Sequence, residues 1–162
     1  IKFSCCGKGF VNYFEKFQIS GFLMKIATWN INSVRLRIKS VLRFIKIHDI
    51  DVICLQETKT QDENFPSDEF VRIGMKHQYF RGEKSYNGVA IISKFKFEEN
   101  GYINWCNKDD TRHISVKLGE YLELHNFYVP AGGDEPDIKS NPKFLHKIEF
   151  LNEMKSYFIR NK

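Results

Sequence analysis

The sequence contains no apolar run of the length, about 18 residues or more, that a membrane-spanning helix needs. Its first residues also lack the continuous apolar stretch and small-residue cleavage site that mark a secretory signal peptide. These two absences argue against a helical membrane protein and against an exported precursor. We therefore expect a soluble, cytoplasmic protein with no membrane partner.

Cysteines are few and are not spaced for metal binding. The four are Cys5, Cys6, Cys54 and Cys106, and no two of them form a C-x-x-C pair. The adjacent Cys5 and Cys6 cannot easily bridge to one another. The pattern therefore predicts neither a zinc site nor a disulfide framework, and it fits a reducing cytosol.

No internal repeat or low-complexity linker interrupts the 162 residues, of which 42% are hydrophobic and 15% aromatic. This length and composition are typical of one globular domain with a substantial core. Lys and Arg number 25 against 20 Asp and Glu, which gives a net charge of +5. The excess mildly favours an anionic partner such as nucleic acid, and an ordinary basic protein fits it equally well.

The pattern changes at Met24. Residues 1–23 begin without methionine and show no clear periodicity, whereas a regularly patterned segment starts at Met24. We expect residues 1–23 to be either upstream sequence translated in frame or a short extension packed on the domain, and we favour the first. The domain itself is expected over residues 24–162.

Strand-like and helix-like stretches alternate from Met24 onward. Residues 25–31 read as a strand, and apolar residues then recur at helical spacing through residues 33–49, with Ser33 as the N-cap. Residues 51–56 are typical of a strand buried on both faces, which completes a β-α-β unit. A short helix is expected after Pro66. Further strands are expected over residues 77–83, 88–97, 113–118 and 121–129, the last two joined by a tight turn at Gly119-Glu120.

Residues 141–162 predict a helix with one apolar face. Asn141 is expected as its N-cap, with Pro142 at the first helical position. The apolar stripe, which we expect to be core, consists of Leu145, Ile148, Leu151, Met154 and Phe158. A helix that follows strands in this way normally leads into another strand. None follows here, so we expect the chain to lack part of its domain.

Glu57 and Asn30 are the first candidates for chemistry. Each lies at the end of an expected strand, and one helix joins the two strands, so parallel pairing would bring both ends to the same cleft. Carboxylate and amide oxygens suit Mg²⁺, which keeps several waters for a substrate phosphate. A solvated Glu57 paired with Lys59, and asparagines that merely form a turn at Asn30 and Asn32, are equally consistent with the pattern.

Four stretches of the sequence, in the order in which they occur, resemble the N-terminal half of the members of one enzyme family. They are MKIATWNINSVRLR, DVICLQETK, YNGVAIISK and LHNFYVPAGG. Together they are similar to the exodeoxyribonuclease III family of apurinic/apyrimidinic endonucleases, within the endonuclease/exonuclease/phosphatase superfamily. The resemblance covers Met24 to about Lys162, and four motifs at compatible spacing make it specific.

The resemblance implies a fold and an activity. The fold would be α/β, a four-layered α/β sandwich of the deoxyribonuclease I-like type, here reduced to roughly its first half. The activity would be Mg²⁺- or Mn²⁺-dependent hydrolysis of double-stranded DNA at abasic sites and from 3′ ends, by a protein expected to be monomeric at full length. Glu57 matches the metal-binding glutamate, Asn30 the asparagine beside the metal, and Tyr128 the active-site tyrosine that contacts the scissile phosphate.

Basic and polar loop residues fit the same interpretation. Arg35, Lys59, Tyr86, Asn87 and Arg112 are candidates for contacts with DNA phosphates, although exposed Arg and Lys are most often only solvated. His113 and His125 lie at strand positions. We expect them to be packed or surface residues and not ligands.

The family's second half carries an Asp-x-Asn motif, whose aspartate activates water, and a late Asp-His pair, and the resemblance ends before the place of either. We therefore expect the chain alone to be inactive or nearly so. Two alternatives stay open. One is a noncatalytic half-domain that binds nucleic acid or a partner chain, and the other is a phosphoinositide or sphingomyelin phosphodiesterase of the same superfamily.

Overall fold

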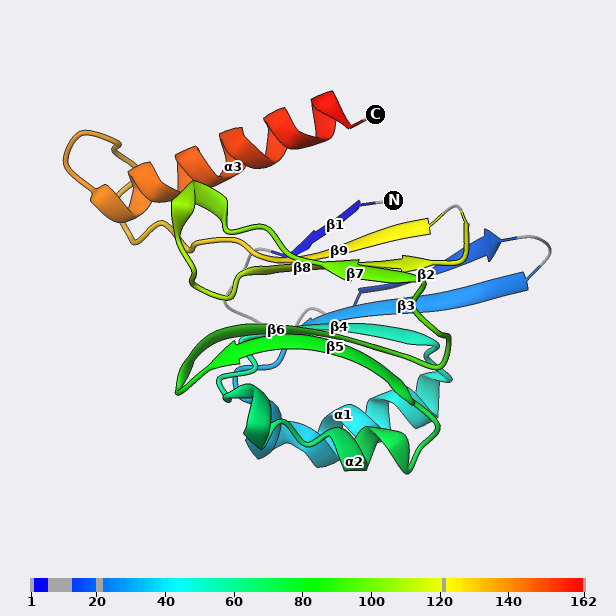
Figure 1. Ribbon diagram of the computed structural model, residues 1–162. Helices are drawn as coiled ribbons and strands as arrows, with labels where there is room; N and C mark the ends of the chain where they lie inside the picture. The colour runs from blue at the N-terminus through cyan, green and yellow to red at the C-terminus, as the bar shows by residue number, and fades with distance from the viewer. Residues whose placement is uncertain (1, 6–12, 20–21, 121, 162) are drawn as a thin grey trace.

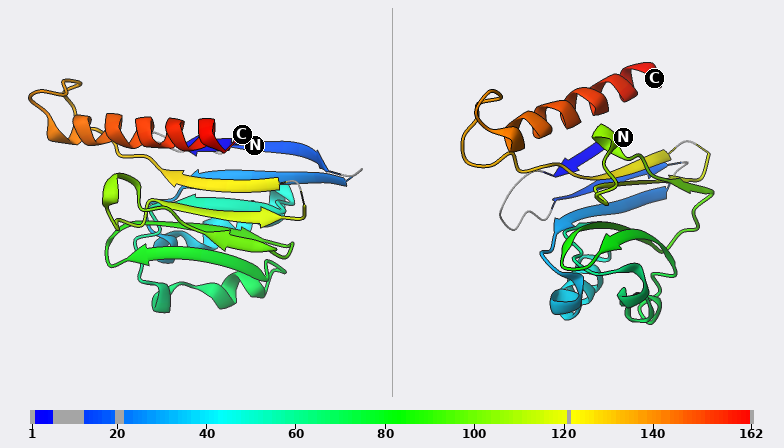
Figure 2. Two further views of the ribbon diagram at one scale, coloured as in Figure 1. Left: turned by 45° about the horizontal axis from the view of Figure 1, so that its top comes forward. Right: turned by 60° about the vertical axis from the view of Figure 1, so that its left-hand side comes forward.

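The structure, a computed structural model, describes residues 2–5, 13–19, 22–120 and 122–161. Two β-sheets lie face to face, with α1 and α2 on the outer face of one and α3 on the outer face of the other (Figure 1). The turned views show the same four layers (Figure 2). The α/β sandwich expected from the resemblance is confirmed. Among the described residues, no helix has both the length and the apolar character needed to cross a membrane.

The five-stranded sheet has the order β2-β3-β4-β6-β5, and the four-stranded sheet has the order β1-β9-β8-β7. The strands are β1 Lys2–Cys5, β2 Tyr13–Ile19, β3 Phe22–Asn30, β4 Val52–Gln56, β5 His77–Glu83, β6 Tyr86–Ser93, β7 Glu99–Gly101, β8 His113–Leu118 and β9 Leu122–Tyr128. The helices are α1 Val34–His48, α2 Ser67–Val71 and α3 Pro142–Arg160, with short 3₁₀ turns η1 Asp62–Asn64 and η2 Trp105–Asn107.

The predicted β-α-β unit is present. β3 and β4 pair in parallel with Asn30 opposite Gln56, and α1 makes the crossover between them. All five residues of β4 are buried, as the apolar run predicted. The cause is that β4 lies in the middle of its sheet, with α1 packed on one face and the four-stranded sheet on the other.

Three hydrophobic clusters fill the spaces between the layers. The first lies between α1, α2 and the five-stranded sheet and includes Leu55 and Phe70. The second lies between the two sheets and includes Cys54 and Leu124. The third, which includes Phe150, lies under α3. Alternate residues of a strand point to opposite faces, so neighbours Cys54 and Leu55 belong to different clusters.

The start of α1 differs from the prediction. Ser33 occupies the N-cap position, as predicted, and its carbonyl oxygen accepts from the Arg37 N–H, but its φ is 91° and its side chain makes no capping bond. The backbone N–H groups of Ser33 and Val34 instead donate to the carbonyl oxygens of Glu57 and Thr58. Carbonyls from the loop after β4 thus satisfy backbone donors at the start of the helix that have no acceptor within the helix.

β6 ends earlier than the expected strand over residues 88–97. It stops at Ser93, whose hydroxyl accepts a hydrogen bond from the Phe95 N–H and bends the chain. Lys94 then turns its ammonium group to the carboxylates of Asp49 and Asp51, at 2.8 and 2.9 Å. These polar contacts outweigh the strand propensity of the last four residues.

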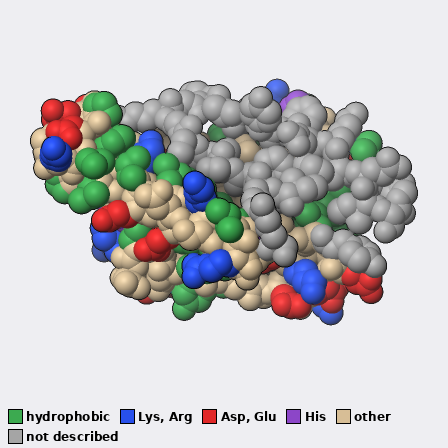
Figure 3. All heavy atoms as spheres, turned by 90° about the horizontal axis from the view of Figure 1, so that it is seen from above, with side chains coloured by type: hydrophobic (Ala, Val, Ile, Leu, Met, Phe, Trp, Pro, Cys, Tyr) green, Lys and Arg blue, Asp and Glu red, His purple; other side chains and the backbone are tan. Residues whose placement is uncertain are grey.

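α3 begins as predicted, with the Asn141 side chain accepting from two N–H groups of the first turn and Pro142 at the first position. The predicted stripe was only partly correct. Leu145 is 39% exposed, and hydrophobic side chains gather on the surface over this end of the helix (Figure 3). The packed face is rotated toward Phe150 and Tyr157, because Trp105 and Phe127 below offer aromatic surfaces.

The described parts of residues 1–23 form strands, which the sequence pattern did not indicate. β1 pairs in parallel with β9, and β2 pairs antiparallel with β3, so each extends one sheet. Residues 1, 6–12 and 20–21 lie outside the described part. The expectation that 1–23 is a segment added to the domain stays a prediction.

Leu55→Ala should lower the free energy of unfolding by about 2–5 kcal/mol, because it removes a fully buried side chain from the cluster under α1. Urea denaturation of the chain measures this. Leu36→Ala, at a residue of α1 that is 82% exposed, is the matched control and should change stability by no more than about 0.5 kcal/mol. Equal effects of the two substitutions would contradict the assigned core.

Candidate functional site: a carboxylate cluster at the ends of β3, β4 and β9

The loop after β4 holds Glu57 in an unusual backbone conformation. Glu57 and Lys59 have φ values of 55° and 50°, in the left-handed region that costs a non-glycine residue roughly 1–2 kcal/mol. Two hydrogen bonds from the start of α1 hold the loop, with Ser33 N–H to Glu57 O at 2.7 Å and Val34 N–H to Thr58 O at 3.0 Å. The loop is therefore fixed to the helix that connects β3 and β4.

The β5–β6 hairpin holds the same loop from the other side. Thr58 N–H donates to Gly88 O at 3.1 Å, and Lys59 N–H donates to Asn87 O at 2.9 Å. The fit requires glycine, because a Cβ added at Gly88 would lie 2.1 Å from Thr58 Oγ1. A Cβ added at Gly82 would lie 2.1 Å from a backbone oxygen of this loop. Glu57 thus sits on a segment that is hydrogen-bonded on both flanks.

The Glu57 carboxylate is the centre of the site. Its Oε1 accepts hydrogen bonds from Asn30 Nδ2 at 2.8 Å and from the Tyr128 hydroxyl at 2.9 Å. Its Oε2 lies 3.0 Å from the ammonium group of Lys59. The structure therefore brings together Asn30, Glu57 and Tyr128 from β3, the loop after β4, and β9.

These contacts determine the protonation of the cluster. Burial alone would raise the pKa of Glu57, but hydrogen bonds from Asn30, Lys59 and Tyr128 bring that pKa below its ordinary value. Burial and the hydrogen bond to Glu57 raise the pKa of Tyr128 to about 12. At neutral pH the site therefore holds an ionised carboxylate and a neutral phenol that donates to it.

A buried amide network explains how Tyr128 reaches Glu57 from the other sheet. Asn126 points from β9 toward the five-stranded sheet, where its Nδ2 donates to the carbonyl oxygens of Leu55 and Ala90, both at 2.9 Å. Its Oδ1 accepts from Gln56 Nε2 at 2.7 Å. Tyr128 lies two residues further along the same strand face, so this register places its hydroxyl beside the residue after Gln56.

Arg112 supports the ring of Tyr128. Its guanidinium carbon lies 4.8 Å from the ring centroid, and its Nη1 donates to Tyr128 O at 3.2 Å. The guanidinium is fixed by Asp110, whose Oδ2 accepts from Arg112 Nε at 2.6 Å. Arg112 is thus a positive charge next to the phenol, and its proposed contact with DNA stays a prediction.

The other proposed DNA contacts differ in their surroundings. Arg35 is exposed on the first turn of α1, and Tyr86 is 61% exposed at the start of β6. Asn87 is only 2% exposed, and its Nδ2 donates to Glu83 Oε1 and to Asp110 O. The side chain of Asn87 therefore supports the loop backbone in this structure, and a contact between it and DNA would require rearrangement.

Three polar residues of the cluster were not singled out as functional from the sequence. Asn32 was expected only as a turn residue, which its φ of 48° confirms, but its Oδ1 also accepts from Lys59 Nζ at 2.6 Å. Gln56 and Asn126 form the buried network. A polar residue inside an otherwise apolar strand was their one signal in the sequence.

The two strand histidines are packed, as expected. His113 and His125 are 1% and 2% exposed, and His113 Nε2 lies 3.0 Å from His125 Nδ1. Burial, followed by the effect of His125, lowers the pKa of His113 to about 3, so His113 is neutral at physiological pH. They form part of the aromatic packing under α3 and do not face Glu57.

The cluster offers the donor atoms that a hard divalent cation prefers. Asn30 turns its Nδ2 to Glu57, which leaves its Oδ1 as a ligand atom beside an ionised carboxylate. The Lys59 ammonium group already lies between Glu57 Oε2 and Asn32 Oδ1, so the oxygens of this site accommodate positive charge. The donor set therefore fits a cation such as Mg²⁺ held by one protein carboxylate.

The sequence matches the model of the endonuclease/exonuclease/phosphatase family over residues 27–159. The match covers most of the chain, including Asn30, Glu57 and Tyr128. The chain belongs to this family, whose nucleases are metal-dependent.

Relatives place it near the DNA repair nucleases of the family. It is 38% identical over 140 residues to exodeoxyribonuclease III of Haemophilus influenzae, covering 83% of this chain and 51% of that protein. An AP endonuclease structure from Archaeoglobus fulgidus matches with a TM-score of 0.77 and 34% identity, over 86% of this chain and 52% of that one. The structure of the 3′ phosphatase NExo from Neisseria, solved with a product DNA hairpin, matches with a TM-score of 0.75 and 28% identity. That match covers 85% of this chain and 52% of NExo. The chain therefore spans about half the length of these relatives.

Asn126→Ala should lower the free energy of unfolding by at least about 2 kcal/mol, because the buried carbonyls of Leu55 and Ala90 each lose a donor. Urea denaturation measures the change. Asn100→Ala, at an exposed residue of β7, is the matched control and should stay within about 0.5 kcal/mol of the unmodified chain. A loss at Asn126 no larger than at Asn100 would show that the network does not hold the sheets together.

Tyr128→Phe should raise the pKa of Glu57, because one hydrogen bond to the carboxylate is lost. The ¹³C shift of the Glu57 carboxyl carbon followed against pH measures that pKa. In the unmodified chain the stability contributed by Glu57 is present above the ordinary glutamate pKa and is lost as pH falls through the lowered value. Tyr128→Phe should bring the pKa of Glu57 closer to the ordinary glutamate value, so Glu57 should contribute less to stability at neutral pH. Tyr102→Phe, at a tyrosine that is 53% exposed, should leave the pKa of Glu57 unchanged.

Proposed function

We propose that this chain supplies the metal-binding and phosphate-binding half of the active site of a DNA repair phosphodiesterase. The reaction is hydrolysis of the DNA backbone at abasic sites and at 3′ ends. The observation that carries the proposal is the meeting of Asn30, Glu57 and Tyr128 at one carboxylate. Membership of the family and similarity to DNA repair nucleases support it.

The roles of the residues follow from their contacts. Glu57, ionised at neutral pH, would hold Mg²⁺ or Mn²⁺ together with Asn30 Oδ1. The bound ion would polarise a phosphate oxygen and lower the pKa of a water molecule. Asn30 orients the carboxylate by donating to Oε1, and Lys59 balances its charge in the absence of substrate.

Tyr128 is the proposed phosphate-binding donor. Its high pKa keeps the phenol protonated, so its O–H can move from Glu57 to an oxygen of a scissile phosphate as negative charge develops there. Arg112 lies over its ring and adds positive charge on the same side. Arg35, which is exposed, and Lys59, which is half-buried, are suited to phosphate contacts that position a duplex without reading its sequence.

The base that activates the attacking water is proposed to come from outside these 162 residues. None of the described carboxylates other than Glu57 contacts the Asn30–Tyr128 pair. The chain by itself should therefore bind the metal, and bind DNA weakly, while cutting DNA little or not at all.

A chimera tests the proposal. Residues 24–162 would replace the matching front half of exodeoxyribonuclease III from Haemophilus influenzae, which is 38% identical to this chain. The substrate is a duplex with one abasic site, and nicking should require Mg²⁺ and stop with EDTA. Glu57→Gln and Tyr128→Phe should each slow nicking by roughly 100-fold or more, as expected for loss of a group that acts in the transition state. Glu98→Gln, at an exposed glutamate, should leave the rate unchanged.

Four outcomes would count against the proposal or a part of it. A folded chimera that nicks equally well with Glu57→Gln would remove Glu57 from the site. Metal-dependent nicking by the 162-residue chain alone would refute the proposed need for a base from outside it. Binding of DNA by a folded chimera that never cuts would favour a noncatalytic role, and hydrolysis of inositol phosphates in place of DNA would favour the lipid phosphodiesterases.

A further inference from the structure

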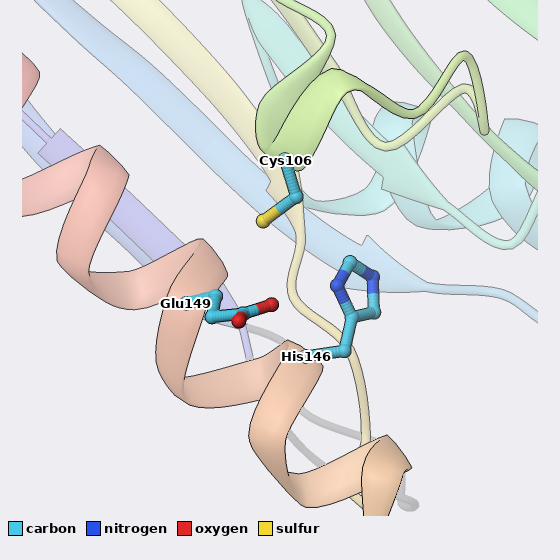
Figure 4. Close-up of side chains that lie close together, drawn as sticks. All are labelled: Cys106, His146 and Glu149. Carbon is cyan, nitrogen blue, oxygen red and sulfur yellow. The ribbon is translucent and has the colours of Figure 1, made fainter.

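A second group of metal-ligating side chains lies where η2 packs against α3. Cys106 is the middle residue of η2, and His146 and Glu149 are three residues apart on α3, so both project from one side of the helix. The three side chains point toward one another (Figure 4). Their candidate ligand atoms, one from each residue, all lie within 4.8 Å of one another.

His146 has no hydrogen-bond partner in the described structure. Both of its ring nitrogens are inaccessible to solvent and unpaired, and the side chain as a whole is only 15% exposed. One ring nitrogen faces Cys106 and Glu149 (Figure 4). Nε2 lies 4.0 Å from Asp110 Oδ2. Buried polar groups normally have hydrogen-bond partners, and burying two ring nitrogens without them costs free energy.

The charge states suit coordination of a cation. Burial, followed by the nearby Lys108, lowers the pKa of His146, so the imidazole is neutral with a free lone pair at physiological pH. Burial and the carboxylates of Glu153 and Glu149 raise the pKa of the Cys106 thiol. A positive ion would relieve the repulsion that the thiolate otherwise meets there.

We propose that Cys106, His146 and Glu149 bind one Zn²⁺-type ion through sulfur, nitrogen and oxygen, with water as the fourth ligand. Thiolate and imidazole donors favour zinc over magnesium, so this site differs in chemistry from the oxygen cluster at Glu57. Binding forms the metal–sulfur bond and releases the proton of the Cys106 thiol to solvent. Nδ1 of His146 is the ligand atom, and the Nε2–H turns to Asp110, as outer carboxylates orient metal-bound histidines.

The site would join two segments that are far apart in the sequence. Apart from aromatic packing, a hydrogen bond from the Cys106 N–H to Glu153 Oε2 at 2.7 Å connects η2 with α3. A metal ion bound to Cys106 and to two helix side chains would fix α3 to the four-stranded sheet. Cysteine spacing gave no sign of this, because a single cysteine meets a histidine and a glutamate only after folding.

A cobalt titration of the reduced 162-residue chain tests the proposal. Co²⁺ should produce a thiolate-to-metal absorption band in the near ultraviolet that saturates at one equivalent, and Zn²⁺ should abolish the band by displacement. The band should be lost with Cys106→Ser. His146→Ala should weaken Co²⁺ binding at least about tenfold, the lower end of what losing even a supporting residue of a metal site costs.

Three control variants should keep the band. Cys5→Ser/Cys6→Ser removes the two thiols near the start of the sequence, and the remaining one, Cys54, is buried between the sheets. Glu57→Gln removes the oxygen-rich site, so an unchanged band separates this proposal from the proposed function. His48→Gln changes an exposed histidine at the end of α1.

Circular dichroism checks that each variant folds, and Zn²⁺ X-ray absorption on the unmodified chain provides a test that needs no variant. One sulfur with nitrogen and oxygen neighbours is the expected shell, and a shell with no sulfur, or with two, would overturn the proposal. Survival of the cobalt band in folded Cys106→Ser, its loss in Cys5→Ser/Cys6→Ser, or no band on the unmodified chain would also overturn it.

Discussion

The contact between the Asn126 and Gln56 amides sets the relation between the two sheets. Apolar side chains between sheets attract one another without fixing a register, because burial of apolar area is not directional. An amide that must satisfy two carbonyls and accept from a third group has one position that meets all three needs. That position aligns β9 with β4, and Tyr128 and Glu57 meet as a result.

The loop after β4 shows how the fold uses backbone energy at this point. Two of its residues have left-handed conformations that an unsupported loop would avoid. Their support comes from the first turn of α1 and from the β5–β6 hairpin, which are separate in sequence. A carboxylate on such a segment loses little further freedom when it takes up a ligand, which is the physical meaning of preorganisation.

Local sequence pattern predicted most helices and strands from residue 24 onward. Contacts between residues distant in sequence account for most of the differences between the predicted and the observed structure. The proximity of Asn30 and Glu57 followed from the rule that parallel strands end at one edge, whereas Tyr128 entered only through family resemblance. The role of Asn126 could not be predicted, since an amide in an apolar strand marks an unusual position but does not say which carbonyls of the other sheet it will meet. Ser33 is the N-cap residue but makes no side-chain cap, and the carbonyls that receive its N–H and that of Val34 come from the loop after β4, which no local pattern indicates. The packed face of α3 was set by the aromatic rings beneath it.

Gly82 and Gly88 have a consequence for how the protein can change during evolution. Both lie against the loop that carries Glu57, so a side chain at either would push on that loop directly. The tip of the same hairpin, at Lys84 and Ser85, is exposed. Insertions at the tip would lengthen the hairpin while its base stays in place. The length of this hairpin can therefore vary among related proteins without moving the Glu57 carboxylate.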